Sequence, residues 1–514
     1  MMSWSDGYHV EAEYTSGYYK ELSPTMQRFS ALLNGYDLPP VGPNDAHMEL
    51  GFGQGVSINI HAAVQPGFFI GNDFNPTHAA HAQQLALASG AHTQFSDESF
   101  AQLDARSDLP MCSSISFHGI WSWINDENRQ HMLNLIQRCL KPGGVVYNSY
   151  NILAGHAAFI PWRNMMVNHF NSQSGPALQR IEATLAYIAG IFEKNPQLLE
   201  QNPSLKNSWG RVVNANRNYL LHEYFNANWD CFTLHQVADL MSEVKCQFIG
   251  GINNNQYMNH IHLNPSALEQ VSNQPNILEA ESWRDVLVGN TFRRDLYVKG
   301  GRRLSQSEIV ARLKNYRFVM AVNVDKFGSK LYSESDGREF SQDLFEPIRN
   351  LLAQQDYRPK SFQELLDVTD LNKYNWSNIL QILLFKIDSS QLHVCATHEV
   401  SNELVTQARN LNTALLKELD YNIANVYLAC PTTGSGLVLD FAYAWALRVW
   451  IEDINANDQV ICQRIWQCLQ ANNRFLIDKN GNQLNDEKAT YAFLKEIIQD
   501  AHQLLPIWKQ LGVI

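Results

Sequence analysis

Short apolar runs alternate with helical segments between residues 46 and 151. The apolar run at 46–50 leads directly into the glycine turn GFGQG, and the segment that follows, VSINIHAA, has the pattern of a helix start. Further strands are predicted at 67–73, 93–97, 113–118 and 145–151, with helices at 76–90 and 128–140. Strands that alternate with helices at this spacing predict an α/β domain built on a parallel sheet.

Residues 156–221 have a helical pattern and interrupt this α/β unit. Five apolar residues recur at spacings of 3, 4, 3 and 4, which predicts one apolar stripe along a helix: Leu178, Ile181, Leu185, Ile188 and Phe192. Such a stripe has to be buried against the rest of the domain or against a second copy of the chain. Two later runs, at 245–252 and 292–300, supply strands that would complete a sheet of seven.

The pattern changes after residue 303. Two helices followed by a β segment suggest a winged-helix-like module, and the remainder of the chain is mostly amphipathic helix. The apolar stretch at 436–451 contains Asp440 and Arg448 and is shorter than the roughly 20 residues that cross a bilayer, so it predicts a buried helix. We expect five regions: a core at 1–155, a helical insertion at 156–221, the rest of the core at 222–302, and C-terminal regions at 303–404 and 405–514.

The charge balance disfavours a nucleic-acid partner. Lys and Arg number 39 against 51 Asp and Glu, a net charge of −12, whereas surfaces that bind phosphates are usually basic. The eight cysteines form no CxxC pair, and the N-terminus lacks the basic and apolar regions of a signal peptide. Both features favour a cytoplasmic protein with reduced thiols.

A ligand site is expected where the first two strands end. Gly51, Gly53 and Gly55 let the chain turn tightly and approach a ligand closely at the carboxyl edge of the predicted sheet. Asp73 ends the second strand 22 residues after Gly51, where an acid can accept hydrogen bonds from ribose hydroxyls. The spacing GxGxG differs from the GxGxxG of dinucleotide enzymes, and Glu49 beside the turn suits a cationic ligand better than a phosphate.

Two other segments give no indication of a ligand site or a metal site. TTGSG at 432–436 lacks the lysine of a P-loop and is expected to be a plain loop. HAAH at 78–81 has no clustered partner, so no metal site is expected.

These residues together resemble the class I S-adenosylmethionine-dependent methyltransferases. The resemblance rests on ELGFGQG at 49–55, on Asp73 and Asp97, and on LKPGG at 140–144. It is closer still to a subgroup with a methyltransferase regulatory region, which includes rickettsial lysine methyltransferases that act on outer-membrane surface proteins. The segments that resemble the subgroup are YTSGYYKELSP (14–24), GNDFNP (71–76), FHGIWSWINDENR (117–129), NSYNILAG (148–155), HEYFNANW (222–229) and FRRDLYVKG (292–300). The implied fold is a Rossmann-like, seven-stranded methyltransferase sheet with a helical insertion and a C-terminal α+β region.

The resemblance also implies roles in binding S-adenosylmethionine. The residues beside its amino-acid part would be Glu49, Gly51, Gly53 and Gly55, with Asp73 at the ribose and Asp97 at the adenine. Asp97 equally fits a plain helix N-cap. Tyr18, with Tyr14 and Tyr19, would fold over the cofactor as a lid, although a packing role suits this cluster as well.

The methyl acceptor would bind just past the fourth strand. Aromatic faces stabilise a cationic methylammonium group and exclude water, so Trp121 and Trp123 suit a lysine or amine acceptor. His118 could accept a proton from the incoming nucleophile. The alternatives are two packing tryptophans and a histidine that caps a strand end.

The segment HEYFN adds His222, Glu223 and Tyr224, which resemble the subgroup's residues near an ammonium substrate. A carboxylate there could orient the amine and take up its proton, and a surface helix face is the alternative reading. No DPPY or NPPY follows the fourth strand, which disfavours methylation of nucleic-acid bases.

The leading hypothesis is a cytoplasmic methyltransferase that acts on protein lysine and forms a homodimer through its helical insertion. The alternative acceptor is a small metabolite or polysaccharide intermediate. A second alternative is a non-catalytic, cofactor-binding interaction protein. The large regions beyond the core favour a protein acceptor.

Overall fold

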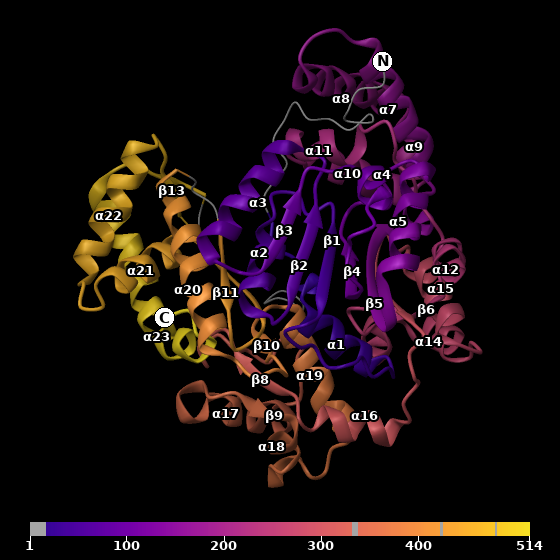
Figure 1. Cartoon of the computed structure of the whole chain (residues 1–514). Helices are drawn as coiled ribbons and strands as arrows, with labels where there is room; N and C mark the ends of the chain where they lie inside the picture. Colours follow the sequence, from indigo (N-terminus) through magenta and orange to yellow (C-terminus); the bar gives the residue numbers. More distant parts are fainter. Residues whose placement is uncertain (1–16, 332–337, 422–424, 479–480) are drawn as a thin grey trace.

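Seven strands form one central sheet in the computed structural model, which describes residues 17–331, 338–421, 425–478 and 481–514 (Figure 1). The strands lie in the order β3-β2-β1-β4-β5-β7-β6, and β7 runs antiparallel to both of its neighbours. Their bounds are β1 Ala46–Leu50, β2 Phe68–Asn72, β3 Thr93–Ser96, β4 Cys112–Phe117, β5 Leu140–Asn151, β6 Cys246–Gly251 and β7 Phe292–Lys299. This topology confirms the predicted Rossmann-like sheet, whose order reverses between β1 and β4.

Helices cover both faces of the sheet. One face carries α1 Pro24–Leu33, α2 Val56–Val64 and α3 Pro76–Ser89, and the other carries α4 Phe100–Ala105, α5 Asp126–Cys139, α12 Leu234–Glu243 and α15 Ile277–Val288. Along β1, Met48 and Leu50 pack in the core beneath α5. Because side chains alternate along a strand, Glu49 faces the side of α2.

Local sequence sets the ends of helices α3 and α4. Asn75 caps α3 by accepting a hydrogen bond from the backbone N–H of Thr77, and Pro76 occupies its first position. Gly90 ends the same helix in the left-handed conformation. Ser99 caps α4 in a capping box with Gln102.

The insertion buries its apolar stripe within itself. It consists of α7 Ile160–Ser172, α8 Ala177–Lys194, α9 Gln197–Glu200, α10 Pro203–Asn214 and α11 Arg217–Tyr224. Four of the five stripe residues, Ile181, Leu185, Ile188 and Phe192, are buried with residues of α7, α10 and α11. Leu178 is 43% exposed. The stripe therefore needs no second copy of the chain to cover it.

Residues 303–404 contain a three-stranded antiparallel sheet in the order β10-β8-β9. Its strands are β8 Arg317–Met320, β9 Lys360–Ser361 and β10 Leu392–Val394, and its helices are α16 Gln306–Leu313, α17 Gln342–Tyr357, α18 Phe362–Leu366 and α19 Trp376–Asp388. They share one core with residues of α1. The winged-helix assignment of this region stays a prediction.

The C-terminal region packs on the core beside α2 and α3 (Figure 1). It consists of the helices α20 Asn402–Lys417, α21 Phe441–Glu452, α22 Asp458–Ala471 and α23 Glu487–Leu511, the hairpin of β11 Val426–Cys430 and β12 Ser435–Leu439, and the short pair β13 Leu476–Ile477 and β14 Gln483–Leu484. The apolar stretch at 436–451 forms β12 and most of α21, and α21 is largely buried. Within the described part of the chain, no helix is both long and apolar enough to cross a membrane.

Candidate active site

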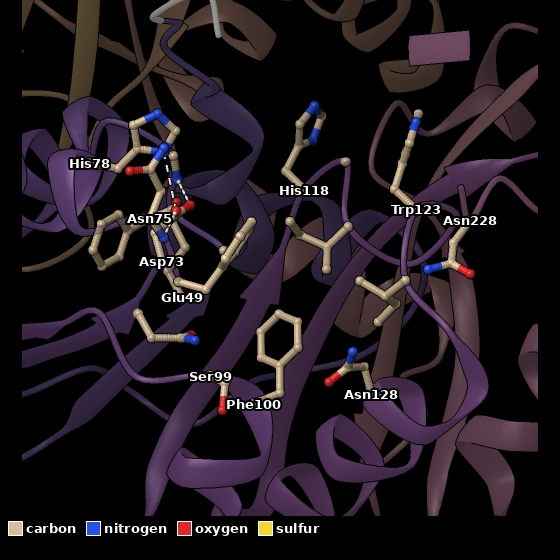
Figure 2. A pocket seen from close by; sticks show the side chains of 18 of the residues that line it. Glu49, Asp73, Asn75, His78, Ser99, Phe100, His118, Trp123, Asn128 and Asn228 are labelled. Carbon is tan, nitrogen blue, oxygen red and sulfur yellow. Dashed lines mark hydrogen bonds and ion pairs between the residues drawn. The ribbon is translucent and has the colours of Figure 1, made fainter. Parts of the chain in front are cut away.

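A cavity of about 360 Å³ opens at the carboxyl edge of the sheet, where β1, β2 and β4 end. Figure 2 shows Asp73, Asn75 and His78 at one end of it, Trp123 and Asn228 at the other, and His118 between them. Nine residues proposed from the sequence line this cavity: Tyr19, Glu49, Gly51, Gly53, Asp73, His118, Trp123, His222 and Glu223. Five others lie outside the lining set: Tyr18, Gly55, Asp97, Trp121 and Tyr224.

The glycine turn holds the chain close to the cavity. The backbone N–H groups of Gly51 and Phe52 both donate to the carbonyl of Asn72, which ties the turn to the end of β2. Gly53 has a φ of 60° and open space where a Cβ would be, and it lines the cavity. Gly55 has a different use, because a Cβ there would lie 2.3 Å from the Cβ of Ala82 and would separate α2 from α3.

Asp73 is fixed by three hydrogen bonds before any ligand binds. Its Oδ2 accepts from the backbone N–H of Gly53 at 2.8 Å, and its Oδ1 accepts from the backbone N–H of Asn75 and from the Nδ1 of His78, both at 3.1 Å. A carboxylate has about four acceptor positions, so one remains for a hydroxyl in the cavity. This geometry suits a ribose.

Glu49 is buried at the end of β1 and lines the cavity. Among the residues that the structure describes, its carboxyl group makes no hydrogen bond or ion pair. Burial raises the pKa of Glu49 to about 8, because the ionised form loses its hydration without a compensating charge. A ligand ammonium group would supply that charge.

The third strand contributes through the residues that follow it. Ser99 and Phe100, at the start of α4, line the cavity, whereas Asp97 is exposed and lies outside the lining set. The apolar ring of Phe100 offers a surface for a flat base. A ligand with hydroxyls, a flat ring and an ammonium group thus fits Asp73, Phe100 and Glu49.

His118 lies at the centre of the cavity, just after β4. Its Nδ1 is hydrogen-bonded to the hydroxyl of Tyr147 at 2.8 Å and lies 3.3 Å from that of Ser149, and the ring of Tyr19 packs on it at 3.9 Å between centroids. Burial and, to a smaller extent, the nearby positive charge of Arg294 together lower the pKa of His118 to about 3. The imidazole is therefore neutral at physiological pH.

The two tryptophans have different surroundings. Trp121 is fully buried between the sheet and α5 and stacks on Phe117 at 5.8 Å. Trp123 lines the cavity, and its Nε1 donates to the carbonyl oxygen of Glu223 at 3.4 Å. Trp123 rather than Trp121 presents its ring to a ligand.

The helix α11 brings the insertion to the cavity. His222 and Glu223 line it, while Tyr224 packs between Phe159 and Trp229 in the core of the insertion. Burial and the neighbouring Glu223 raise the pKa of Tyr224.

The tyrosines of the N-terminal segment also differ in their surroundings. Tyr19 lines the cavity, whereas the hydroxyl of Tyr18 is bonded to Ser435 of the C-terminal hairpin. Tyr14 lies outside the described residues.

Several lining residues escaped the sequence analysis, namely Asn75, His78, Ser99, Phe100, Asn128 and Asn228. His78 follows Asp73 by five residues, and only the turn at Asn75 and Pro76 brings its ring back to the carboxylate. Ser99 carried a usable signal, because it begins a capping box immediately after the third strand. No group of three or more His, Cys, Asp or Glu side chains that could hold a metal occurs in the described residues.

Two family models match the chain: a methyltransferase domain over residues 48–144 and a predicted methyltransferase regulatory domain over residues 216–299. The uncharacterized protein sll1526 of Synechocystis sp. is 30% identical over the full length of both chains. The uncharacterized protein RP028 of Rickettsia prowazekii is 28% identical over 134 residues, which cover 25% of this chain and 48% of that protein.

The solved structures extend the likeness to the whole chain. PKMT2 from Rickettsia typhi in complex with AdoHcy superposes with a TM-score of 0.71 at 17% identity, over 97% of this chain and 100% of that one. A second structure of PKMT2 gives a TM-score of 0.68 at 18% identity, over 98% of this chain and 100% of that one. The fold is shared along the C-terminal regions as well as the core.

Proposed function

The chain belongs to the class I S-adenosylmethionine-dependent methyltransferases that carry a methyltransferase regulatory domain, and from that premise we propose that it methylates lysine side chains of proteins. One observation carries the choice of acceptor. Trp123 and Glu223 both line the cavity, Trp123 at the end away from Asp73 (Figure 2), and the Nε1 of Trp123 donates to the backbone carbonyl oxygen of Glu223. An aromatic face beside a carboxylate is a good environment for an alkylammonium group.

Each end of the cavity then has its own task. Asp73 and Glu49 hold the ribose and the ammonium group of the cofactor, and the turn at Gly51 and Gly53 allows close approach. Bound S-adenosylmethionine supplies a methyl group on a sulfonium, which an amine lone pair can displace along the line of the breaking bond. Most of the work of the protein is therefore positioning.

At the acceptor end, Glu223 orients the lysine side chain. The lysine ammonium group must lose a proton before its nitrogen can attack the methyl group, and the carboxylate of Glu223 takes up that proton. The ring of Trp123 packs on the charged product and keeps water out. His118 is neutral, and its Nδ1 is occupied by Tyr147, so its task is to orient the acceptor rather than to take up a proton.

The size of the shared fold supports a protein acceptor. The likeness to PKMT2 of Rickettsia typhi extends beyond the methyltransferase core through both C-terminal regions. Binding a small methyl acceptor would not require regions of this size in addition to the core. The eight unpaired cysteines support the cytoplasmic location that we propose.

The test is the transfer of labelled methyl from S-adenosylmethionine into a lysate of the source cell, resolved by size and by amino-acid hydrolysis. Label in a protein band that yields methylated lysine supports the proposal. Label only in small or carbohydrate fractions moves the acceptor to a metabolite or polysaccharide intermediate.

The variant Glu223→Gln sharpens this test. It should lower the rate of transfer by about 10²-fold, the usual contribution of a positioned proton acceptor, and leave cofactor affinity unchanged. Glu182→Gln, which removes a carboxylate from the surface of the same insertion, is the matched control.

A further inference from the structure

Residues 18–22, which we call the strap, connect the cavity to both C-terminal regions. The strap runs past the end of β4 and continues into α1 through the N-cap residue Ser23. Its five side chains contact four different parts of the molecule.

Tyr18 is anchored to the C-terminal hairpin. Its hydroxyl lies 2.5 Å from the Oγ of Ser435 and accepts from the backbone N–H of Gly436 at 2.6 Å. A Cβ at Gly436 would lie 2.8 Å from the Tyr18 ring, so the glycine allows the ring to lie flat on β12. Ser23 adds a bond to the carbonyl of Gly434 at 2.8 Å. The TTGSG segment, expected to be a plain loop, is thus the docking point of the strap.

Lys20 is anchored to the C-terminal region formed by residues 303–404. Its ammonium group donates to the carbonyl of Ile387, and to the Oγ of Ser390 at 3.3 Å, at the C-terminal end of α19. The carbonyls at a helix C-terminus are unsatisfied within the helix and carry partial negative charge, so they favour a cation. Lys20 therefore caps α19 from another part of the chain.

Tyr19 lies between these two anchors and turns the other way. Its backbone is extended, with φ −118° and ψ 98°, so its side chain leaves the strap on the side opposite to Tyr18. Its N–H donates to the Oγ of Ser57 at 2.9 Å, in the first turn of α2, and its ring packs on His118 at 3.9 Å between centroids. Leu22 lines the same cavity, and Glu21 pairs with Arg294 of β7 at 2.9 Å.

We propose that the two C-terminal regions fix the centre of the active site through this strap, and that Tyr19 is the positioning residue for His118. Residues of the C-terminal regions hold Tyr18 and Lys20 in place. Tyr19, which lies between them, is thereby held in contact with the imidazole of His118. Loosening either anchor frees Tyr19 and lets the His118 ring turn away from Tyr147. The proposal concerns the shape of the cavity and holds whatever the methyl acceptor is.

The consequence is a link between distant surfaces and the cavity. A ligand or protein that displaces the β11–β12 hairpin or the end of α19 acts on His118 through a single segment of backbone. This gives the C-terminal regions a task in the reaction although none of their described residues lines the cavity.

The experiment is carbethoxylation of the full-length protein with diethyl pyrocarbonate, which attacks neutral imidazole, followed by peptide mass spectrometry. His118 and His131 both line the cavity, but only His118 is covered by the strap, so His131 is an internal reference. Tyr19→Ala should raise the rate at His118 severalfold, and Tyr19→Phe, which keeps the ring, should restore protection.

The anchors are tested from a distance by Tyr18→Phe and Lys20→Met. Both should raise the rate at His118 and leave that at His131 unchanged. The matched controls are Tyr443→Phe and Lys326→Met, which remove a tyrosine hydroxyl and a lysine from bonds to Asp500 in the C-terminal region without touching the strap. The controls should change neither rate.

Three results would overturn the proposal. An unchanged rate at His118 in both anchor variants would mean that the C-terminal regions do not hold Tyr19. Equal rises at His118 and His131 would mean general loosening of the cavity. Equal effects of the controls and the anchor variants would mean that any weakening of the C-terminal region opens the site.

Discussion

The backbone N–H of Gly53 donates a 2.8 Å hydrogen bond to the Oδ2 of Asp73, which joins the glycine turn to the acid at the end of β2. These two features were recognised separately in the sequence, 20 residues apart. In the fold they form one unit, because parallel strands present their carboxyl ends at a common edge. The position of the carboxylate is therefore set by the turn as well as by its own strand.

Asp73→Asn should weaken cofactor binding at least tenfold, or about 1.4 kcal/mol, because the amide loses the charge and cannot accept on both sides. Calorimetric titration with S-adenosylmethionine measures this. Asp97→Asn is the control and should bind as the wild type does, since Asp97 is exposed outside the cavity lining. Unchanged affinity in Asp73→Asn would remove the ribose assignment, and a loss in Asp97→Asn would restore the assignment of Asp97 to the adenine.

Cofactor binding should release a proton near pH 7. The carboxyl of Glu49 has a pKa raised to about 8 by burial, so it is mostly protonated there, and an adjacent ammonium group lowers that pKa. Affinity should therefore rise with pH up to about 8 and level off above it. Calorimetry in buffers of different ionisation enthalpy counts the proton.

The control for Glu49 lies in the same cavity. Glu49→Gln should abolish the proton release, whereas Glu127→Gln, which removes an exposed carboxylate from the lining, should leave it unchanged. Proton release that persists in Glu49→Gln would assign the titration to another group.

The sequence predicted the sheet well because its signals are local. The glycine turn, the acid after β2 and the proline of α3 each depend on a few neighbouring residues, and each element formed where its pattern indicated. Trp121 and Trp123 could not be distinguished in this way. They lie two positions apart in the turn after β4, where no strand or helix period applies, and only the packing against α5 shows that Trp121 belongs to the core cluster.

Tyr19 lines the cavity because of contacts between residues far apart in the sequence, and no local sequence pattern predicts such contacts. Tyr18 and Tyr19 are adjacent residues of the same type. Tyr18 differs in its environment because its hydroxyl is hydrogen-bonded to Ser435, which lies more than 400 residues away in the sequence. The apolar stripe of α8 presented the same difficulty. Its period predicted a helix correctly, but the surface that buries it is formed by α7, α10 and α11 rather than by a second chain.

Substitution of Trp121 should mainly affect stability, whereas substitution of Trp123 should mainly affect methyl transfer. Trp121→Ala should lower the free energy of unfolding by about 3–5 kcal/mol, because it leaves a cavity in the core. Trp123→Ala should lower methyl transfer with a smaller loss of stability. Thermal denaturation and transfer assays on both variants distinguish these effects. Equal loss of stability in the two would mean that Trp123 is also a core residue.

We propose a homodimer that forms through exposed apolar residues of α7 and α8. Met165, Leu178 and Tyr187 of α7 and α8 are exposed although large and apolar, and a second copy of the insertion could cover them. Sedimentation at micromolar concentration should give twice the chain mass of 58.5 kDa, and Tyr187→Glu should return it to that value. A mass near 58.5 kDa in the wild type would contradict the dimer.

His81 joins the glycine turn to the C-terminal region. His81 of α3 has its Nδ1 2.7 Å from the carbonyl of Gln54 and its Nε2 3.2 Å from the Oε1 of Glu418, just after α20. Both partners only accept hydrogen bonds, so both nitrogens must carry protons, and the bond to Glu418 raises the pKa of His81. Since the folded pKa is raised, this stabilisation is complete below about pH 6.5, the ordinary value of histidine, and is lost as pH rises past the raised value.

A double-mutant cycle with His81→Gln and Glu418→Gln, followed by thermal unfolding at pH 6 and pH 9, measures the coupling. It should amount to less than about 1 kcal/mol at the lower pH, because both side chains are partly exposed, and should vanish at the higher pH. The pair His502 and Asp458, which joins α23 to α22 away from the core, is the control for loss of an exposed histidine–carboxylate pair. Coupling of equal size at both pH values would show that His81 joins the two regions without its charge, and the turn at Gln54 would then be held independently of pH.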